Sequence, residues 1–334
     1  MTPTISIIVP CYNEQATLRG LLDAVLAQTY PLEYLEVVIS DGQSTDGTRD
    51  VISVFQKDHP ELAVLVVDNA LRSIPSSLNR AMEAARGGII LRLDAHSMPY
   101  PDYVARCAQA LEEGRGANVG GVWEVRPGAD TWIAQAIAAA ASHPLGVGDA
   151  LYRLAPQAGA VDTVPFGAFR RSLIESIGAF DETLLSNEDY EFNTRVRQSG
   201  GTVWLDPAIR SVYFARSSLG ALMRQYARYG FWKWRMLRRY PATLRWRQAL
   251  PPLFVSSLVG LSVLGIWFGP FRFWLAAEIL IYFAVLLSAG LRAAQKRQQP
   301  LLAIGLPLAI TSMHLSWGSG FLWSMLSSLV HKNG

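Results

Sequence analysis

Cysteine is scarce in this sequence. Only Cys11 and Cys107 are present, they lie far apart, and neither is surrounded by residues at metal-ligand spacing. A reducing, cytosolic setting is therefore the simplest expectation for the part of the chain that contains them. The first ten residues, MTPTISIIVP, have neither a basic stretch nor a cleavable apolar segment, and they are typical of a first strand rather than of a signal peptide.

The sequence also has little net charge. A formal charge of +3 is too small to indicate a nucleic-acid partner, so the placement of the basic residues matters more than their number. Up to about residue 218, apolar runs alternate with polar loops, and after Pro251 the sequence becomes membrane-like. We therefore expect a soluble cytoplasmic domain over residues 1–218, basic aromatic interfacial helices over 219–249, and a transmembrane domain with about three spans over 250–331.

Short β-branched runs alternate with amphipathic patterns in the front domain. Strands are expected at 5–9, 35–40, 62–67 and 89–93, and helices at 14–28, 44–58 and 74–85, with Asn13 capping the first helix. This alternation implies right-handed crossovers and a mostly parallel sheet flanked by helices, which is an α/β fold. Ligands of such sheets bind beyond the carboxyl ends of the strands.

Polar residues follow three of these strands at that edge. They are Pro10, Tyr12, Asn13 and Glu14 after the first strand, Asp41, Gly42, Ser44, Asp46 and Gly47 after the second, and Asp94 and His96 after the fourth. Three acidic loops on one rim suit a site for a base, a ribose and a metal-bound diphosphate. Any one loop alone is better explained by ordinary caps and turns, so the functional interpretation depends on all three being in register.

At these residues the sequence resembles the family 2 glycosyltransferases, whose catalytic domain is a nucleotide-sugar-binding α/β fold of the GT-A type. The resemblance is carried by four motifs in order over about residues 5–215, namely VPCYNE, SDGQSTDGT, LRLDAH and SNEDYEF. The DAH and NED triplets and the segment RQYARYGFWK are most similar to bacterial membrane glycosyltransferases of exopolysaccharide assembly, of the succinoglycan type.

The resemblance implies a role for each matching residue on the donor side. Pro10, Tyr12 and Glu14 match the family's first nucleotide-contacting loop, and Asp41 matches the carboxylate that hydrogen-bonds the uracil of a UDP-sugar. Gly167, in the segment VPFGAFR, matches the lining of the donor-sugar pocket, and the alternative is that it belongs to a plain turn.

The resemblance also implies a metal site. Asp94 matches the first acid of the family's Asp-x-Asp motif, and His96 replaces the second acid. A neutral imidazole is a good ligand for Mn²⁺ and a poorer one for Mg²⁺, so the expected cofactor is Mn²⁺, with Mg²⁺ as the alternative. Two alternatives to metal binding stay open for His96, which are that it caps a helix or that it donates a hydrogen bond to the diphosphate.

Glu188 and Asp189 match the family's Glu-Asp pair, in which the aspartate acts as general base. Direct displacement at an anomeric carbon requires the acceptor hydroxyl to lose its proton, and a carboxylate within hydrogen-bond reach can accept it. A single displacement inverts the configuration of that carbon. In isolation, the two acids are equally well explained as helix N-terminal charges.

Residues 219–249 combine many cations and aromatic rings with no acidic residue. The cations are Arg224, Arg228, Lys233, Arg235, Arg238, Arg239, Arg245 and Arg247. This composition predicts an interfacial helix on an anionic membrane leaflet. The run Gln225-x-x-Arg228-Tyr229 also resembles the Gln-x-x-Arg-Trp motif of membrane-bound polysaccharide synthases, which implies donor contact by Arg228 and acceptor contact by Gln225 and Tyr229. The alternative is that these residues only anchor the helix.

Three apolar stretches follow, at about 250–269, 272–291 and 301–330. The first two have the length of a membrane span, and the third either spans with tilt or combines a short interfacial piece before Pro307 with a span after it. Arg292, Lys296 and Arg297 separate the second stretch from the third, whereas the first connection carries only Arg272. Together with the basic segment before residue 250, this distribution predicts that the front domain lies in the cytoplasm and the C-terminus outside. The resemblance implies that the membrane is the bacterial inner membrane.

The expected function is an inverting, metal-dependent transfer of a hexose from a UDP-sugar to a polyprenyl-diphosphate-linked saccharide in exopolysaccharide assembly. The expected partners are the donor, the lipid-linked acceptor, the bilayer and other proteins of a polysaccharide assembly complex, and no nucleic acid. Two alternatives stay open. One is a transferase acting on polyprenyl phosphate itself, as in dolichyl-phosphate-sugar synthesis, and the other is a non-catalytic membrane scaffold of a glycan assembly complex.

Overall fold

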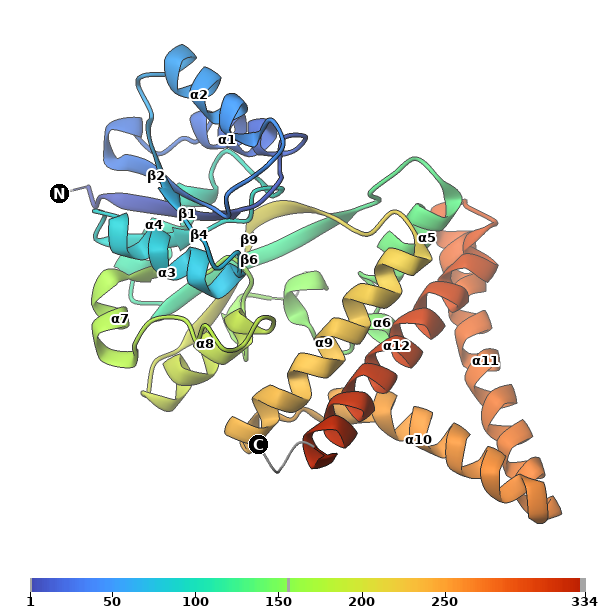
Figure 1. Ribbon diagram of the computed structural model, residues 1–334. Coiled ribbons are helices and arrows are strands. Elements are labelled where there is room, and N and C mark those ends of the chain that lie inside the picture. Colours follow the sequence, from blue (N-terminus) through green and yellow to red (C-terminus); the bar gives the residue numbers. More distant parts are fainter. Residues whose placement is uncertain (1, 155–156, 331–334) are drawn as a thin grey trace. The chain divides into compact units, whose positions relative to one another are not determined.

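The computed structural model describes residues 2–154 and 157–330, and the chain divides into two compact units (Figure 1). The first unit comprises Met1–Glu124 and Ala155–Tyr213, and the second comprises Val125–Leu154 and Phe214–Gly334. Residues 125–154 lie within the front domain that the sequence led us to expect, yet they pack with the C-terminal helices.

The first unit is built on one mixed sheet. Within the described residues its nine strands are β1 (Ile5–Cys11), β2 (Leu35–Asp41), β3 (Ala63–Asp68), β4 (Ile89–Arg92), β5 (Met98–Pro99), β6 (Asn118–Arg126), β7 (Gly159–Ala160), β8 (Ala168–Arg170) and β9 (Val203–Phe214). Their order is β3-β2-β1-β4-β8-β6-β9-β5, with β7 beside β9. β1 to β4 pair in parallel and β8 runs antiparallel to β4. The expected α/β fold is confirmed, and the sheet gains an antiparallel half.

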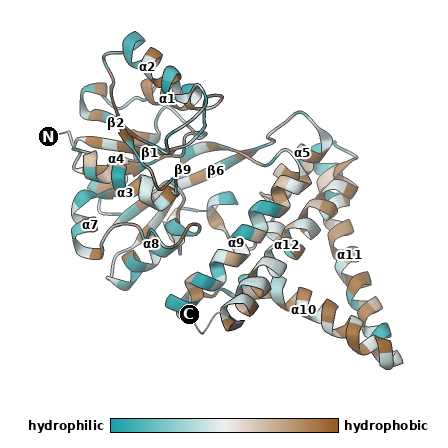
Figure 2. Ribbon diagram, in the orientation of Figure 1, coloured by the Kyte–Doolittle hydropathy of each residue, from teal (hydrophilic) through white to brown (hydrophobic). Residues whose placement is uncertain are grey.

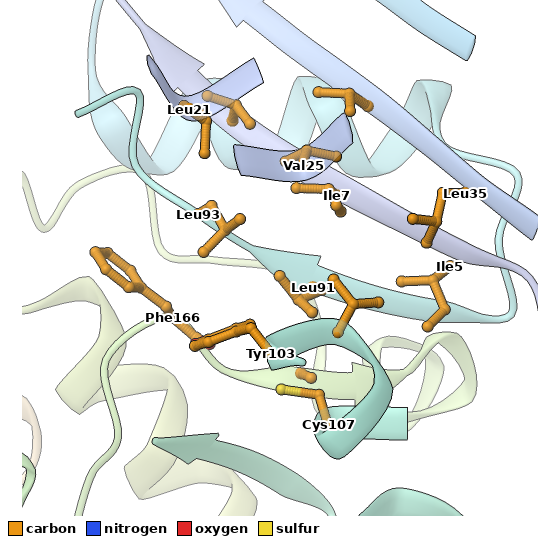
Figure 3. Close-up of a cluster of buried hydrophobic side chains, with 14 of the residues drawn as sticks. Ile5, Ile7, Leu21, Val25, Leu35, Leu91, Leu93, Tyr103, Cys107 and Phe166 are labelled. Atoms are coloured by element: carbon orange, nitrogen blue, oxygen red, sulfur yellow. The ribbon is translucent and has the colours of Figure 1, made fainter. Parts of the chain in front are cut away.

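Helices of the first unit pack against this sheet. They are α1 (Leu18–Leu26), α2 (Thr48–Asp58), α3 (Ile74–Ala84), α4 (Tyr103–Glu112), α7 (Arg171–Ile177) and α8 (Glu188–Gln198). Because side chains alternate between the faces of a strand, Ile5 and Ile7 of β1 enter the same core, where they meet Leu21 of α1 and Tyr103 and Cys107 of α4 (Figure 3). Burial raises the pKa of the Cys107 thiol above its ordinary range, as expected of an unreactive core cysteine.

Strand register brings the carboxyl ends of β1, β2 and β3 to one edge, since Cys11 lies opposite Asp41, and Asp41 opposite Asp68.

Asn13 links the loop after β1 to the loop after β2 by hydrogen bonds at that edge. Its backbone N–H donates to Ser44 Oγ at 2.8 Å, and its side-chain oxygen accepts from the Thr45 N–H at 2.8 Å. The expectation that Asn13 caps the first helix is wrong, because α1 begins only at Leu18 and the Asn13 backbone is left-handed, with φ of 53°.

The second unit is helical. Its helices are α5 (Trp132–Ala140), α6 (Pro144–Val147), α9 (Leu219–Arg239), α10 (Trp246–Trp267), α11 (Gly269–Arg297) and α12 (Leu302–Val330). α9 and α12 approach each other closely at small residues. A Cβ atom on Gly230 of α9 would lie 2.0 Å from the Trp317 carbonyl oxygen, and one on Gly320 of α12 would lie 2.2 Å from that of Ala227. Glycine therefore permits this helix–helix contact.

Two helices in the described part of the chain, α10 and α11, are long and apolar enough to cross a membrane. Their ribbons are coloured mostly as hydrophobic in Figure 2, and most of their large apolar side chains are exposed. The third expected stretch forms α12, which is not one of these two. Thr311, Ser312, His314 and Ser316 interrupt its apolar character midway along the helix.

Candidate active site

Acidic side chains from two distant segments meet at the carboxyl end of β4. β4 ends at Arg92 and is followed by Asp94, and α8 begins at Glu188 and Asp189. Asn187, with φ of 67°, turns the chain sharply into α8 and places both acids in its first turn. The unsatisfied N–H groups of a helix N-terminus favour negative charge at this position.

Arg92 joins these acids, although only Asp94 and His96 of its motif, LRLDAH, were expected to act at the site. Its Nη2 donates to Asp94 Oδ1 at 3.0 Å and to Glu188 Oε1 at 3.1 Å, and its Nη1 donates to Asp189 Oδ1. Only 4% of the Arg92 side chain is exposed, compared with 28% for Asp189. The metal motif and the general-base motif are therefore connected through one buried guanidinium, and Asp189 keeps an exposed face.

Burial and charge act in opposite directions on this cluster. Burial raises the pKa of Asp189 to about 7, with further raising by Glu188 and Asp94, although Arg92 acts to lower it. Burial alone would lower the pKa of Arg92, but the three carboxylates outweigh it and hold that pKa above its ordinary value. A carboxylate that titrates near neutral pH is well matched to accept a proton from a hydroxyl.

His96 is oriented by Glu14 from the loop after β1. The His96 Nδ1 and Glu14 Oε1 atoms lie 3.1 Å apart, and the Glu14 carboxylate also accepts a hydrogen bond from Thr17. Burial alone would raise the pKa of Glu14, but the His96 and Thr17 hydrogen bonds outweigh it and lower that pKa. When Nδ1–H donates to Glu14, the ring lone pair is on Nε2. A carboxylate partner on one ring nitrogen is the usual arrangement for a histidine that binds a metal through the other.

A metal ion fits the donor atoms present. In the part of the chain that the structure describes, no group of three or more His, Cys, Asp or Glu side chains is arranged as a metal site. Mg²⁺ and similar ions are, however, commonly held by one or two protein ligands together with substrate phosphates. Asp94, whose Oδ1 accepts from Arg92, and His96, whose Nδ1 faces Glu14, are the residues that would hold the ion.

Tyr12 extends from the end of β1 with 43% of its surface exposed. Gly42 lies against it, because a Cβ atom there would be 3.1 Å from a ring carbon of Tyr12. The guanidinium of Arg72 lies 5.4 Å from the ring centroid. An exposed ring at the carboxyl edge, with a cation beside it, suits stacking by a nucleotide base. Pro10 lies in β1 opposite Ser40, and its expected donor contact stays a prediction.

Asp41 is fully buried, and its oxygens are already hydrogen-bonded within the chain. Oδ1 accepts from Ser44 Oγ at 2.5 Å, and Oδ2 accepts from Arg49 Nε at 2.6 Å. Arg49 also pairs with the exposed Asp68 at the end of β3. Contact between Asp41 and a uracil stays a prediction. Asp68 sits at the same edge and was missed, because a single acid after a strand is typical of an ordinary turn.

Close packing against Asn118 leaves no room for a side chain at Gly167. A Cβ atom there would lie 2.2 Å from Asn118 Oδ1. The Asn118 amide, in turn, donates to Asn193 Oδ1 at 2.6 Å in the buried interior. The Gly167 carbonyl accepts from the Arg92 N–H at 3.0 Å, so this segment also supports the strand that carries Arg92. The expected donor contact at Gly167 stays a prediction.

Gln225, Arg228 and Tyr229 lie on α9, in the second unit. The Gln225 amide donates to the Tyr229 hydroxyl at 3.0 Å, which fixes two of the three side chains relative to each other along the helix. The donor contact expected of Arg228 and the acceptor contacts expected of Gln225 and Tyr229 stay predictions.

The sheet of this chain, parallel in one half and antiparallel in the other, with acids beyond the carboxyl ends of its parallel strands, belongs to a GT-A-type glycosyltransferase fold. The mannosyltransferase PcManGT from Pyrobaculum calidifontis, solved with GDP-Man and Mn²⁺, aligns with a TM-score of 0.59 at 22% identity. The alignment covers 100% of this chain and 89% of that one, and at this identity the likeness concerns the fold.

Sequence comparison identifies the family. The model of glycosyl transferase family 2 matches residues 6–178. The succinoglycan biosynthesis protein ExoA of Rhizobium meliloti is 30% identical, over 98% of this chain and 96% of its own length. The dolichyl N-acetyl-alpha-D-glucosaminyl phosphate 3-beta-D-2,3-diacetamido-2,3-dideoxy-beta-D-glucuronosyltransferase of Methanococcus voltae is 28% identical, over 96% and 97%. The chain belongs to glycosyl transferase family 2 and is a glycosyltransferase.

Proposed function

We propose that this chain is an inverting, metal-dependent transferase that moves a hexose from a UDP-sugar to a polyprenyl-diphosphate-linked saccharide in exopolysaccharide assembly. The observation that carries the proposal is the meeting of Asp94, Glu188 and Asp189 around Arg92, with His96 and Glu14 at the same edge of the sheet. This arrangement brings together, at one edge of the sheet, a group that can accept a proton and atoms that can hold a cation beside a diphosphate.

Asp189 is the proposed general base. The acceptor hydroxyl oxygen forms a bond to the anomeric carbon while the bond from that carbon to the diphosphate oxygen breaks, and UDP leaves with the bonding electron pair. The hydroxyl proton passes to the Asp189 carboxylate, whose exposed face is the side open to an acceptor. Attack opposite the leaving group inverts the anomeric configuration, so an α-linked donor gives a β-linked product.

Asp94 and His96 are the proposed metal-holding residues, and an ion bound there would neutralise negative charge on the departing diphosphate. Glu14 orients the His96 ring through its hydrogen bond to Nδ1. With one imidazole in place of a carboxylate, this pair of ligands favours Mn²⁺ over Mg²⁺. Tyr12 is the proposed stacking surface for the base of the donor, because its ring is exposed at the same edge.

The acceptor is proposed to be lipid-linked because of the names of two near-full-length relatives. The M. voltae protein acts on a dolichyl phosphate that already carries a sugar, and the R. meliloti protein serves succinoglycan biosynthesis. Both names are consistent with addition of a further sugar to a membrane-bound carrier during synthesis of a polysaccharide or lipid-linked glycan.

Membrane anchoring is proposed to use α10 and α11. At about 1.5 Å per residue, the 22 residues of α10 extend about 33 Å, close to the thickness of the hydrocarbon core of a bilayer. Exposed aromatic side chains lie at both ends of α10 and at the start of α11, namely Trp246, Trp267, Phe268, Phe273 and Trp274. Rings at these positions are typical of membrane–water interfaces. The positively charged α9 favours a cytoplasmic location for the catalytic unit at the inner membrane.

Release of the nucleotide tests the proposal. Detergent-solubilised full-length protein is incubated with crude lipid-linked acceptor, a panel of UDP-sugars and GDP-mannose, and Mn²⁺, Mg²⁺ or EDTA. We expect UDP release with one hexose donor, dependent on added metal and greater with Mn²⁺. Release from GDP-mannose alone would refute the choice of uridine, and release unaffected by EDTA would refute the metal site. No release from any donor would favour the non-catalytic scaffold.

A further inference from the structure

Arg92 lies at the centre of the proposed site but has no role in the reaction proposed above. It is the last residue of β4, its backbone N–H is held by the Gly167 carbonyl, and its side chain is 4% exposed. Its side-chain hydrogen bonds within the cluster go to the carboxylates of three residues, Asp94, Glu188 and Asp189. A guanidinium buried in this way cannot face a bound sugar or diphosphate, so it acts on the site only through these carboxylates.

The charge and shape of the guanidinium explain why residue 92 is an arginine. One guanidinium faces three carboxyl groups, so with all three ionised the cluster carries an excess of two negative charges in a partly buried space. Neighbouring carboxylates repel one another, and without a cation between them they would separate or take up protons. The planar fork of arginine presents several donors in fixed directions, whereas the ammonium of lysine is a compact point charge that cannot reproduce this pattern of contacts.

We propose that Arg92 is a positioning residue, which fixes the Asp189 carboxylate relative to Asp94 so that the base and the diphosphate-binding motif act on the same sugar. This inference rests on the proposed function of the two acids. Asp94 and Asp189 are 95 positions apart in the sequence, Asp94 just after β4 and Asp189 in the first turn of α8. The Arg92 side chain contacts both. Displacing a reacting group by about 1 Å can cost on the order of 10²-fold in rate.

The test compares Arg92→Lys and Arg92→Ala with Arg195→Lys as a matched control. Arg195 is also an arginine paired with a carboxylate, on Glu191 of α8, and it donates to the Ile177 carbonyl at 2.6 Å without contacting the cluster. We expect Arg92→Lys to lower kcat by about 10²-fold while the KM for the donor changes by less than about threefold. Added guanidinium should restore part of the kcat of Arg92→Ala, and Arg195→Lys should keep the wild-type kcat.

Three outcomes would overturn the proposal. Wild-type kcat in both Arg92 variants, with only a lower Tm, would make Arg92 a purely structural residue. A raised donor KM with unchanged kcat would make it a donor-binding residue. The third outcome is structural. If crystal structures of the wild type and of Arg92→Lys show the Asp189 carboxylate in the same place relative to Asp94, Arg92 does not position it. This comparison needs no activity, so it separates failure of this inference from failure of the proposed function, which a wild type that transfers no sugar would show.

Discussion

Replacing Asp189 with asparagine removes the proposed general base with little change in shape. The amide oxygen of asparagine can still accept the hydrogen bond that Asp189 takes from Arg92. The substitution also lowers the excess negative charge around Arg92 from two to one. We therefore expect Asp189→Asn to fold, to keep the wild-type Tm within a few degrees, and to bind the donor nucleotide normally.

The expected loss in rate follows from the role of the carboxylate. General base catalysis typically contributes about 10²–10⁴-fold, so a loss of about 10³-fold in kcat, equivalent to about 4 kcal/mol, is the central expectation. The pKa of Asp189 adds a second signature. Because burial raises that pKa to about 7 and the base must be deprotonated, wild-type activity should fall about tenfold per pH unit below pH 7 and level off above pH 8.

Steady-state UDP release between pH 5.5 and 8.5 measures both effects, and calorimetric titration with UDP measures nucleotide binding. Asp181→Asn is the matched control, since Asp181 lies in the turn before α8, where it accepts from the Thr183 N–H and hydroxyl. We expect wild-type kinetics from this control. A kcat for Asp189→Asn above about one third of wild type, or a wild-type profile that is flat down to pH 5.5, would refute the assignment of Asp189 as general base.

Three further predictions concern other parts of the chain. His96→Asp restores a second oxygen ligand, so the ratio of Mg²⁺-supported to Mn²⁺-supported UDP release should rise at least about threefold, and an unchanged ratio would mean that His96 does not bind the metal. Gly167→Ala should lower the free energy of unfolding by about 1–3 kcal/mol, because the new methyl would meet Asn118 at 2.2 Å. Gly88→Ala, whose Cβ meets no atom within 4 Å, is its control, and equal thermal shifts for both would contradict the steric reason. Because α12 packs along α9, whose cations cannot enter hydrocarbon, we now expect only α10 and α11 to cross the bilayer and the C-terminus to lie on the side of α9, in place of the three spans and outside C-terminus predicted from the sequence. Labelling of a cysteine added at the C-terminus by a membrane-impermeant maleimide in oriented vesicles checks this, and a C-terminus on the opposite side would refute it.

The sequence predicted the parallel half of the sheet well, because buried parallel strands are short β-branched runs with polar residues at their ends. The strand at 5–9 became β1 and the strand at 62–67 became β3, with shifts of one or two residues. The same pattern did not show the antiparallel strands. β5, β7 and β8 are two or three residues long, β6 contains two adjacent glycines, and β9 contains a proline and charged residues. Nor did the pattern show that α5 packs with the C-terminal helices, because an alanine-rich helix carries no sign of which partner covers it.

At the site, the sequence identified the acids but not the cation between them. Asp94, Glu188 and Asp189 stood out because they belong to recognisable motifs, and the structure places all three around one side chain. Arg92 carried a signal of a different kind, a charged residue inside an otherwise apolar strand, which requires buried partners. The partners of Arg92 depend on how β4 packs with α8, and the sequence around Arg92 does not contain that information because the two elements are far apart in the chain. The burial of Asp41 could not be predicted for the same reason, because it depends on how other segments of the chain pack around it.

Transfer of a sugar to a defined lipid acceptor tests the proposed reaction most directly. Purified full-length protein, Mn²⁺ and the UDP-hexose selected by nucleotide release are incubated with either a polyprenyl-diphosphate-linked saccharide or polyprenyl phosphate, and the lipids are analysed by mass spectrometry. We predict a product heavier by one hexose from the lipid-linked saccharide alone, absent with Asp189→Asn. A hexose attached to polyprenyl phosphate itself would contradict the proposed acceptor, and an unchanged mass for both lipids would contradict the proposed transfer.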